Sequence, residues 1–159
     1  MTANNSLVVG IGNEFRRDDG VGLILAERLK ARQIPALDVV LHHGEGTGLM
    51  ALWQGRSLAV VIDAVSSGKP AGALHVIDAV RDSVPPDLIL FSSHAFGLAE
   101  AVEMARSLDQ LPKQLWIVGV EGQDFKHGQE LSRDVACALD LALETVLTLI
   151  TSPRADRAA

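Results

Sequence analysis

The chain has 159 residues, a length typical of a single domain. Its 14 Lys plus Arg and 20 Asp plus Glu give a net charge of −6, which argues against a nucleic-acid surface because such a surface needs cations to neutralise phosphates. The single cysteine, Cys137, excludes an intramolecular disulfide and a cysteine-based zinc site. No apolar run is long enough for a membrane span, and Met1–Asn5 does not resemble a signal peptide, so we expect a cytoplasmic protein.

The first part of the chain predicts strands that alternate with helices. A β-branched run at Leu7–Ile11 predicts a buried strand. Apolar residues from Val21 onward recur at helical spacing and predict an amphipathic helix that ends before Pro35. A second strand is predicted at Leu37–Leu41, and a short helix with Thr47 as its candidate N-cap follows.

The second part continues this alternation. Ala59–Ile62 is continuously apolar, as in a strand covered on both faces, and we expect it to end at Asp63. An edge strand, antiparallel to its neighbour, is predicted at Ala73–Ile77, and a helix follows at Gly97–Leu108. A buried strand is predicted at Leu115–Val120, and a last helix, which Ser132 caps, at Ser132–Ile150.

Alternating strands and helices predict a three-layer α/β/α sandwich with a mostly parallel sheet. We expect one domain over residues 1–159, with an ordered core at about 7–150 and short flexible ends. Ligands of such sheets bind beyond the carboxyl ends of the strands. Asp19, Asp63 and His94 all fall near predicted strand ends or in the loops that follow them.

Two adjacent acids, Asp18 and Asp19, stand at the start of the first predicted helix. Acids at this position cap free backbone N–H groups and suit the positive end of the helix dipole. We expect Asp18 to provide the cap, which leaves Asp19 available as a metal ligand or a base. A purely structural role for both remains equally compatible with the sequence.

Asp63 and His94 complete a candidate metal-binding set. An ionised carboxylate at the end of a buried strand is costly without a partner, although Asp63 also fits a cap of the turn that follows it. One imidazole and two carboxylates suit zinc or nickel and leave positions open for water or substrate. His42 and His43 are rival imidazoles, or simply exposed residues where a loop begins.

Other chemistries lack the residues they need. The glycines at Gly10 and Gly12 resemble a dinucleotide-binding turn, but Phe15 replaces its third glycine. The chain has no phosphate loop and no nucleophile elbow. We expect Cys137, Met50 and Met104 to fill the core.

The chain resembles the hydrogenase maturation endopeptidases, which process the C-terminus of the large subunit of nickel–iron hydrogenases. The resemblance covers roughly residues 7–150 and depends on five motifs in the order and spacing of that family. These motifs are Val8–Asn13, Arg17–Gly22, Val61–Val65, Ser93–Leu98 and Val118–Val120.

This resemblance implies a single α/β/α domain with a twisted five-stranded sheet and an aspartyl-type endopeptidase activity. The substrate and partner would be the large-subunit precursor, whose bound nickel is the recognition signal and whose C-terminal extension is removed. The metal-contacting acids of the family fall on Asp19 and Asp63, and its histidine falls on His94. We expect these three residues to be both catalytic and metal-binding, with zinc or cadmium as alternative ions, in a monomer that binds neither nucleic acid nor membrane.

The chain departs from the family pattern at two positions. Asp19 stands where the family often has Glu, and Gly44–Thr47 carries Glu45 where a small residue is common. Two other functions remain as alternatives: a hydrolase like the peptidyl-tRNA hydrolases, whose opening motif is similar, and a nickel-sensing chaperone that binds the precursor without cutting it. The sequence also leaves open whether nickel takes part in hydrolysis or only identifies the substrate.

Overall fold

A sheet with the strand order β2-β1-β3-β6-β4 forms the centre of the computed structural model, which describes residues 5–86, 88–90 and 95–152. Four neighbouring strands are parallel, and the fifth, β4 at one edge, is antiparallel to β6. The bounds of the five strands are β1 Ser6–Ile11, β2 Leu37–His42, β3 Leu58–Ser66, β4 Leu74–Asp78 and β6 Gln114–Glu121. The two-residue strand β5, Ile89–Leu90, pairs antiparallel with the end of β3. The predicted sheet and its antiparallel edge strand are therefore confirmed, with β5 as an addition.

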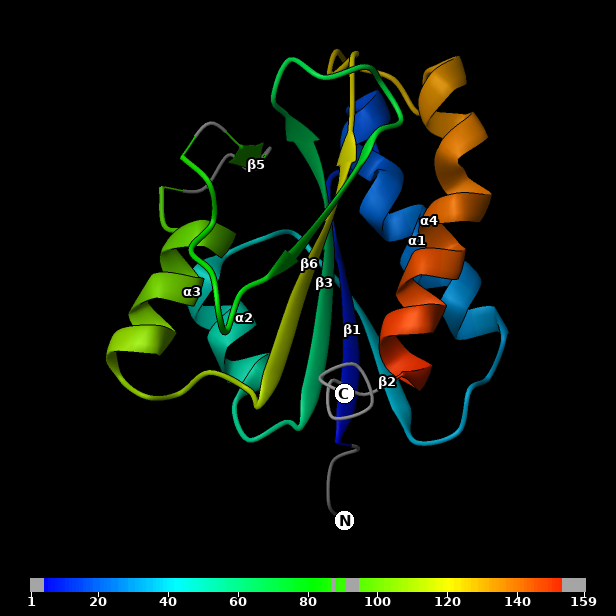
Figure 1. The fold of residues 1–159 in the computed structure, drawn as a ribbon. Helices are drawn as coiled ribbons and strands as arrows, with labels where there is room; N and C mark the ends of the chain where they lie inside the picture. The colour runs from blue at the N-terminus through cyan, green and yellow to red at the C-terminus, as the bar shows by residue number, and fades with distance from the viewer. Residues whose placement is uncertain (1–4, 87, 91–94, 153–159) are drawn as a thin grey trace.

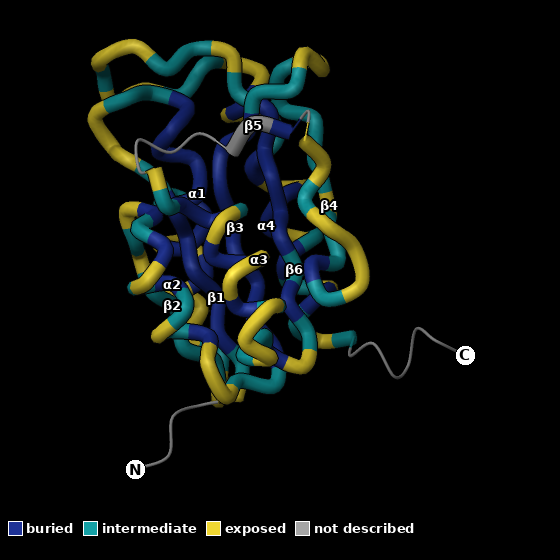
Figure 2. Tube along the Cα trace, turned by 90° about the vertical axis from the view of Figure 1, so that its left-hand side faces the viewer, coloured by how far each residue is buried: buried dark blue, intermediate teal, exposed yellow. Residues whose placement is uncertain are grey.

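The helices cover both faces of this sheet (Figure 1). On one face lie α1 (Val21–Ala31) and α4 (Arg133–Thr151), and on the other lie α2 (Gly46–Trp53) and α3 (Leu98–Ser107). The central strands are buried almost throughout, as Figure 2 shows. Their continuously apolar sequences follow from this arrangement, because helices exclude water from both faces of the sheet.

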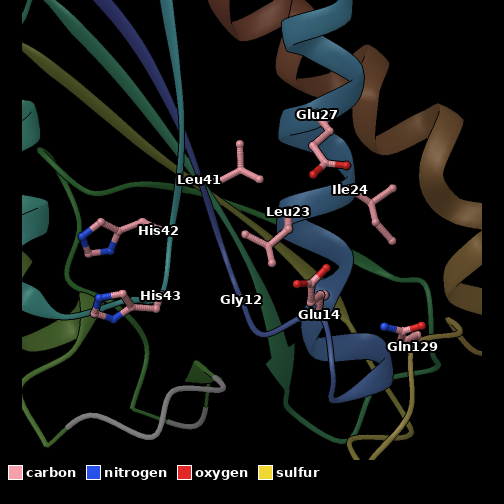
Figure 3. Close-up of a pocket in the computed structure, with 10 residues that line it drawn as sticks. Gly12, Glu14, Leu23, Ile24, Glu27, Leu41, His42, His43 and Gln129 are labelled. Carbon is pink, nitrogen blue, oxygen red and sulfur yellow. The ribbon is translucent and has the colours of Figure 1, made fainter.

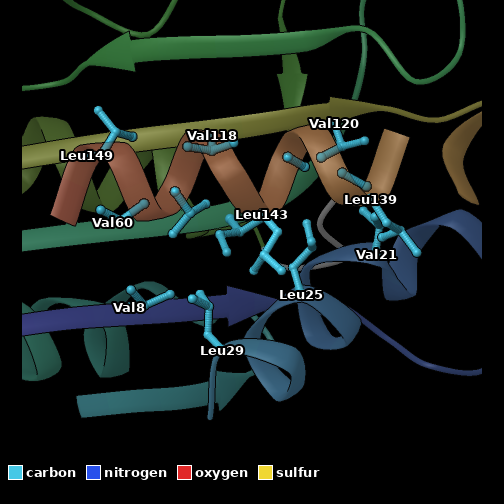
Figure 4. Packing of buried hydrophobic residues seen from close by; sticks show 14 of the residues in the cluster. Val8, Val21, Leu25, Leu29, Val60, Val118, Val120, Leu139, Leu143 and Leu149 are labelled. Atoms are coloured by element: carbon cyan, nitrogen blue, oxygen red, sulfur yellow. The ribbon is translucent and has the colours of Figure 1, made fainter. Parts of the chain in front are cut away.

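Packing between α4 and the sheet illustrates how the core is built (Figure 4). The apolar stripe of α4 recurs at helical spacing and includes Leu139 and Leu143. It meets side chains of β3, β6 and α1 such as Val60, Val118 and Leu25 in one continuous cluster. Burial of each large side chain of this kind contributes about 1.5–3 kcal/mol, so this layer holds α1 and α4 firmly against the strands.

Strand β3 does not end at Asp63, and this prediction was wrong. The strand continues to Ser66 because β6 pairs with it in parallel as far as Val65 opposite Glu121. Asp63 therefore lies inside a strand, opposite Gly119. A local sequence pattern cannot reveal this, because the extra length of the strand is set by its neighbour in the sheet.

Three local predictions also need correction. Glu45, and not Thr47, caps α2: its carboxylate accepts hydrogen bonds from the N–H groups of Thr47 and Gly48 at 2.7 and 2.9 Å. Cys137 and Met104 are exposed and do not fill the core, because they lie on the outer faces of α4 and α3. Met50 is partly buried against the core, as expected.

Within the described residues, no helix combines the length and the apolar character that crossing a bilayer requires. The expected cytoplasmic location stays a prediction. The expected flexible tail falls from residue 153 onward outside the described residues.

Candidate functional site

A close approach between α1 and the sheet positions the two candidate acids. Gly22 in the first turn of α1 lies against the ends of β1 and β3, where an added Cβ would stand 2.4 Å from the carbonyl oxygen of Ile11 and 2.6 Å from that of Ile62. Only glycine permits this contact. The contact brings the short 3-10 turn Arg17–Gly20, which carries Asp19, next to Asp63 in β3.

Asp19 is a nearly buried acid whose charge is only partly compensated. Its exposed fraction is 7%, and its Oδ1 atom has no hydrogen-bond partner among the described residues. Burial raises the pKa of Asp19 to about 6, against the opposing effects of the Arg16 charge and of a backbone hydrogen bond from Asn13. The carboxyl group is therefore ready to exchange a proton near neutral pH.

Asp63 is completely buried, with an exposed fraction of 0%. Its Oδ1 accepts a hydrogen bond from the N–H of Ala64 at 2.8 Å, but its Oδ2 has no partner within the described part of the chain. Burial, together with the charge of Asp19, raises the pKa of Asp63 well above its usual value. The predicted convergence of these two carboxyl groups is thus present in the fold.

Two buried carboxyl groups with unpartnered oxygens need either a proton or a cation. Both oxygens that lack partners are hard donors of the kind that divalent metals accept, so the residues present fit part of a metal site. Among the described residues, no group of three or more His, Cys, Asp or Glu side chains is arranged to hold a metal ion. The third predicted ligand, His94, lies outside the described residues.

Asp18 does not cap α1, contrary to the prediction. Its Oδ2 accepts hydrogen bonds from the N–H groups of Gln123 and Asp124 at 2.9 and 3.0 Å. Ser132 donates two more hydrogen bonds to Asp18, from its N–H to Oδ1 and from its hydroxyl to Oδ2, both at 2.8 Å. Ser132 precedes α4 without capping it through its side chain. Asp18 therefore ties the connection between β6 and α4 to the turn that carries Asp19.

The rival imidazoles lie at the end of β2, where both line a pocket together with Leu23 of α1. Figure 3 shows the rings of His42 and His43 on the far side of β2 from α1. The two rings stack with their centroids 4.9 Å apart, and Nδ1 of His42 accepts a hydrogen bond from the N–H of Gly44 at 2.9 Å. These contacts give both residues a structural role at the end of β2.

Sequence reasoning missed a buried acid at the end of β6. Glu121 is 2% exposed, and its carboxylate accepts hydrogen bonds from the N–H and hydroxyl of Ser67 and from Nε2 of His75. Burial raises the pKa of Glu121, but these hydrogen bonds outweigh it and the net pKa lies below the usual value. The signal was available, because Glu121 follows an apolar strand just as Asp63 does. Its full set of partners distinguishes it from the Asp19–Asp63 pair.

Comparisons with known proteins agree with one another. A family model described as hydrogenase maturation protease matches residues 24–149. The hydrogenase 2 maturation protease of Escherichia coli (strain K12) is 31% identical over 148 residues, which cover 91% of this chain and 89% of that protein. The hydrogenase expression/formation protein HoxM of Cupriavidus necator is 30% identical over 143 residues, 87% of this chain and 70% of HoxM.

Solved structures show the same fold. The hydrogenase-maturating endopeptidase HybD from Escherichia coli superimposes with a TM-score of 0.73 at 23% identity, over 92% of this chain and 91% of HybD. The nickel–iron hydrogenase maturation protease HybD from Thermococcus kodakarensis gives a TM-score of 0.72 at 22% identity, over 91% of this chain and 98% of that one.

Proposed function

The chain belongs to the hydrogenase maturation protease family, and from this membership we propose that it is the endopeptidase that removes the C-terminal extension from a nickel-loaded large-subunit precursor of a nickel–iron hydrogenase. The observation that carries the proposal is the pair of buried carboxyl groups of Asp19 and Asp63, each with one oxygen that lacks a partner among the described residues. Hydrolysis of a peptide bond needs groups that move protons, and this pair supplies them.

The two carboxyl groups suit different steps because their surroundings differ. Asp19, with a pKa of about 6, is mostly ionised at neutral pH and accepts a proton from the attacking water. Asp63, whose pKa lies well above its usual value, holds a proton more readily and donates it to the leaving amine. A pair of acids whose pKa values are pushed apart in this way is the arrangement of aspartyl-type peptidases.

Nickel enters this proposal as part of the substrate. Asp19, Asp63 and His94 would contact the nickel that the precursor presents, and zinc or cadmium would occupy the same ligands. A divalent cation held by Asp19 and Asp63 would offset the burial and like charge that oppose their ionisation, which would favour the precursor over proteins without the metal. Such a cation would also supply polarisation of a peptide carbonyl. Recognition alone and recognition with catalysis both fit the described pair.

The alternatives give different results in the same assay. A peptidyl-tRNA hydrolase needs a surface that holds tRNA phosphates, and the net charge of −6 does not favour one. A nickel-sensing chaperone would bind the precursor without a change in its mass. The family membership favours cleavage over both.

The test is to incubate nickel-loaded precursor with the purified protein and to weigh the precursor by mass spectrometry. The same assay with Asp19→Asn, Asp63→Asn and His94→Ala probes the three residues, and Asp140→Asn is the control because the Asp140 side chain is 98% exposed on α4. We expect loss of the extension with the wild type and the control only. Precursor binding without any loss of mass would support the chaperone, and full processing by the Asp63→Asn variant would contradict the proposed mechanism.

The same cleavage assay with nickel-free precursor and with zinc-loaded precursor tests whether the metal serves only for recognition or also takes part in hydrolysis. A recognition signal alone predicts that high concentrations of metal-free precursor are still cut, with a raised KM. A part in hydrolysis predicts a lowered kcat that saturation with substrate does not restore.

A further inference from the structure

The short turn that carries Asp19 depends on contacts from outside itself. It is a 3-10 turn of only four residues, Arg17–Gly20, and turns of this kind have poor hydrogen-bond geometry and few internal bonds. Arg17 adopts a φ of +49°, a left-handed conformation that is strained for a residue other than glycine. Asp19 does not anchor the turn, because its Oδ1 atom has no hydrogen-bond partner among the described residues. Another segment therefore has to hold the turn in place.

The connection between β6 and α4 supplies this support through backbone groups. The N–H of Asp18 donates a hydrogen bond to the carbonyl oxygen of Asp124 at 3.0 Å, and the N–H of Arg17 donates to that of Gly128 at 2.9 Å. The N–H of Gly128 in turn donates to the carbonyl oxygen of Phe15 at 2.9 Å. The backbone that leads into the turn is thus paired with a segment that is distant in the chain.

Asp18 adds a side-chain attachment to this backbone pairing. Its side chain is completely buried, with an exposed fraction of 0%. Its Oδ2 atom accepts hydrogen bonds from Gln123, Asp124 and the hydroxyl of Ser132, and its Oδ1 atom accepts one from the N–H of Ser132. Hydrogen bonds to a carboxylate are among the stronger ones in proteins, so this set fixes the place of Asp18 closely. Because Asp19 is the next residue, its place is fixed as well.

We propose that Asp18 is a positioning residue of this peptidase, whose hydrogen bonds to the β6–α4 connection hold the carboxyl group of Asp19 in its place beside Asp63. The inference rests on the proposed function and deepens it. Asp18 is inaccessible to a substrate, so it acts only through Asp19. A proton acceptor has to lie within hydrogen-bond distance of the attacking water, and a displacement of about 1 Å costs roughly 100-fold in rate.

The two acids of the pair are held by different means. Asp63 lies within β3, which pairs with β1 on one side and with β6 on the other. The sheet therefore holds Asp63 without the help of Asp18. Loss of the attachment at Asp18 should displace Asp19 and leave Asp63 where it is.

Two substitutions weaken the attachment to different extents. Asp18→Asn leaves one acceptor oxygen where the carboxylate had two, and Ser132→Ala removes only the hydroxyl that donates to Oδ2. Glu121→Gln is the matched control, because Glu121 is also a buried acid with several hydrogen bonds, but its side-chain partners are Ser67 and His75. Urea denaturation of each variant shows how far a loss of stability is shared by the control.

The kinetics of cleavage of nickel-loaded precursor test the role. We expect Asp18→Asn to lower kcat at least tenfold and Ser132→Ala to lower it two- to fivefold, with KM within threefold of wild type in both, because proton transfer is displaced more than binding. Glu121→Gln should keep kcat within twofold of wild type although it is also less stable. An equal loss of kcat in Glu121→Gln would show a general effect of instability and overturn the proposal.

Ser132→Ala also separates position from charge. Asp18→Asn removes a negative charge next to Asp19, whereas Ser132→Ala keeps that charge and removes one hydrogen bond. A lowered kcat in Ser132→Ala supports positioning. An unchanged kcat in this variant would overturn it, whatever Asp18→Asn does.

Amide hydrogen exchange, followed by mass spectrometry, reports on the turn without any substrate. Peptides that span Arg16–Gly22 should exchange at least fivefold faster in Asp18→Asn than in the wild type, and at an unchanged rate in Glu121→Gln. Unchanged exchange in Asp18→Asn would overturn the proposal. Absence of cleavage by the wild type, with this exchange pattern intact, would overturn the proposed function and leave the attachment of the turn by Asp18.

Discussion

The carboxyl groups of Asp19 and Asp63 lie close enough in the fold that the charge of Asp19 raises the pKa of Asp63. Each group is buried and each keeps one oxygen without a partner in the described residues. Such an arrangement costs stability, because burial and like charge both oppose ionisation. A cost of this kind beside the carboxyl end of β1 supports the role proposed for this pair.

Asp63→Asn is expected to stabilise the protein while it abolishes cleavage. The amide keeps the Oδ1 acceptor for the N–H of Ala64 and replaces a group whose ionisation burial and the charge of Asp19 both oppose, so the free energy of unfolding at pH 7.5 should rise by about 1–3 kcal/mol. Urea denaturation measures the change. A variant that is less stable than the wild type at pH 7.5 would contradict the account of the site, and Asp140→Asn should have no effect.

The stability of the wild type should fall as pH rises through the titration of Asp19. Its pKa is raised from 3.8 to about 6 in the folded protein, so between these values the folded state binds more protons than the unfolded state. The free energy of unfolding therefore decreases as pH increases across this window. The gain from Asp63→Asn should be small near pH 4 and should grow as pH rises above 3.8, because the pKa of Asp63 is raised well above this value in the folded protein. Urea denaturation at several pH values would show this growth. A gain that does not depend on pH would contradict this linkage.

Divalent cations should stabilise the wild type through the same pair. Zn²⁺ or Cd²⁺ at a hundred times its dissociation constant would add about 2.7 kcal/mol, because the ion binds only the folded site. The rise in Tm should be larger at pH 7.5 than at pH 5, since protons compete for the carboxylates. Differential scanning calorimetry measures this rise. The double variant Asp19→Asn with Asp63→Asn should lose it, and an equal rise in that variant would place the ion elsewhere.

Gly22→Ala should detach α1 from the sheet. The added Cβ would meet two backbone carbonyl oxygens, which cannot move aside as a flexible side chain can. We expect a loss of about 3 kcal/mol in urea denaturation. Gly20→Ala is the control, because its nearest neighbour would be 3.4 Å away and its φ of −81° suits alanine. Equal stability of the two variants would show that the close approach at Gly22 is not required.

Glu121→Gln should destabilise the protein, in contrast to Asp63→Asn. The carboxylate of Glu121 accepts hydrogen bonds from Ser67 and His75, and an amide cannot accept all of them, so we expect a loss of about 1–3 kcal/mol. Because the pKa of Glu121 is lowered in the folded state, its contribution is full above the ordinary pKa of 4.5 and is lost as pH falls through the lower pKa of the folded protein. Urea denaturation at pH 7 and at a series of pH values below 4.5 checks this, with the exposed Glu144→Gln as control. A loss that does not shrink as pH falls would contradict it.

The sequence by itself determined the layers of this protein and their order. The helices were located by apolar residues that recur at helical spacing, because each helix buries one face. The main strands were located by continuously apolar runs, because helices cover both faces of the sheet. The edge strand Leu74–Asp78 was also found, since its alternating residues follow Pro70 and Gly72. The resemblance to hydrogenase maturation endopeptidases, carried by motifs from residue 8 to residue 120, is confirmed by the family comparison.

Only the tertiary structure decided what the acids of this chain do. Asp18 and Asp19 are neighbours of identical chemistry, yet Asp18 accepts four hydrogen bonds from the β6–α4 connection while Asp19 keeps an unpartnered oxygen. Asp63 and Glu121 stand on adjacent strands, but only Glu121 has a full set of donors. The reason is physical: burial and hydrogen-bond partners come from segments that are distant in the chain, and these partners set the charge and the availability of each carboxyl group.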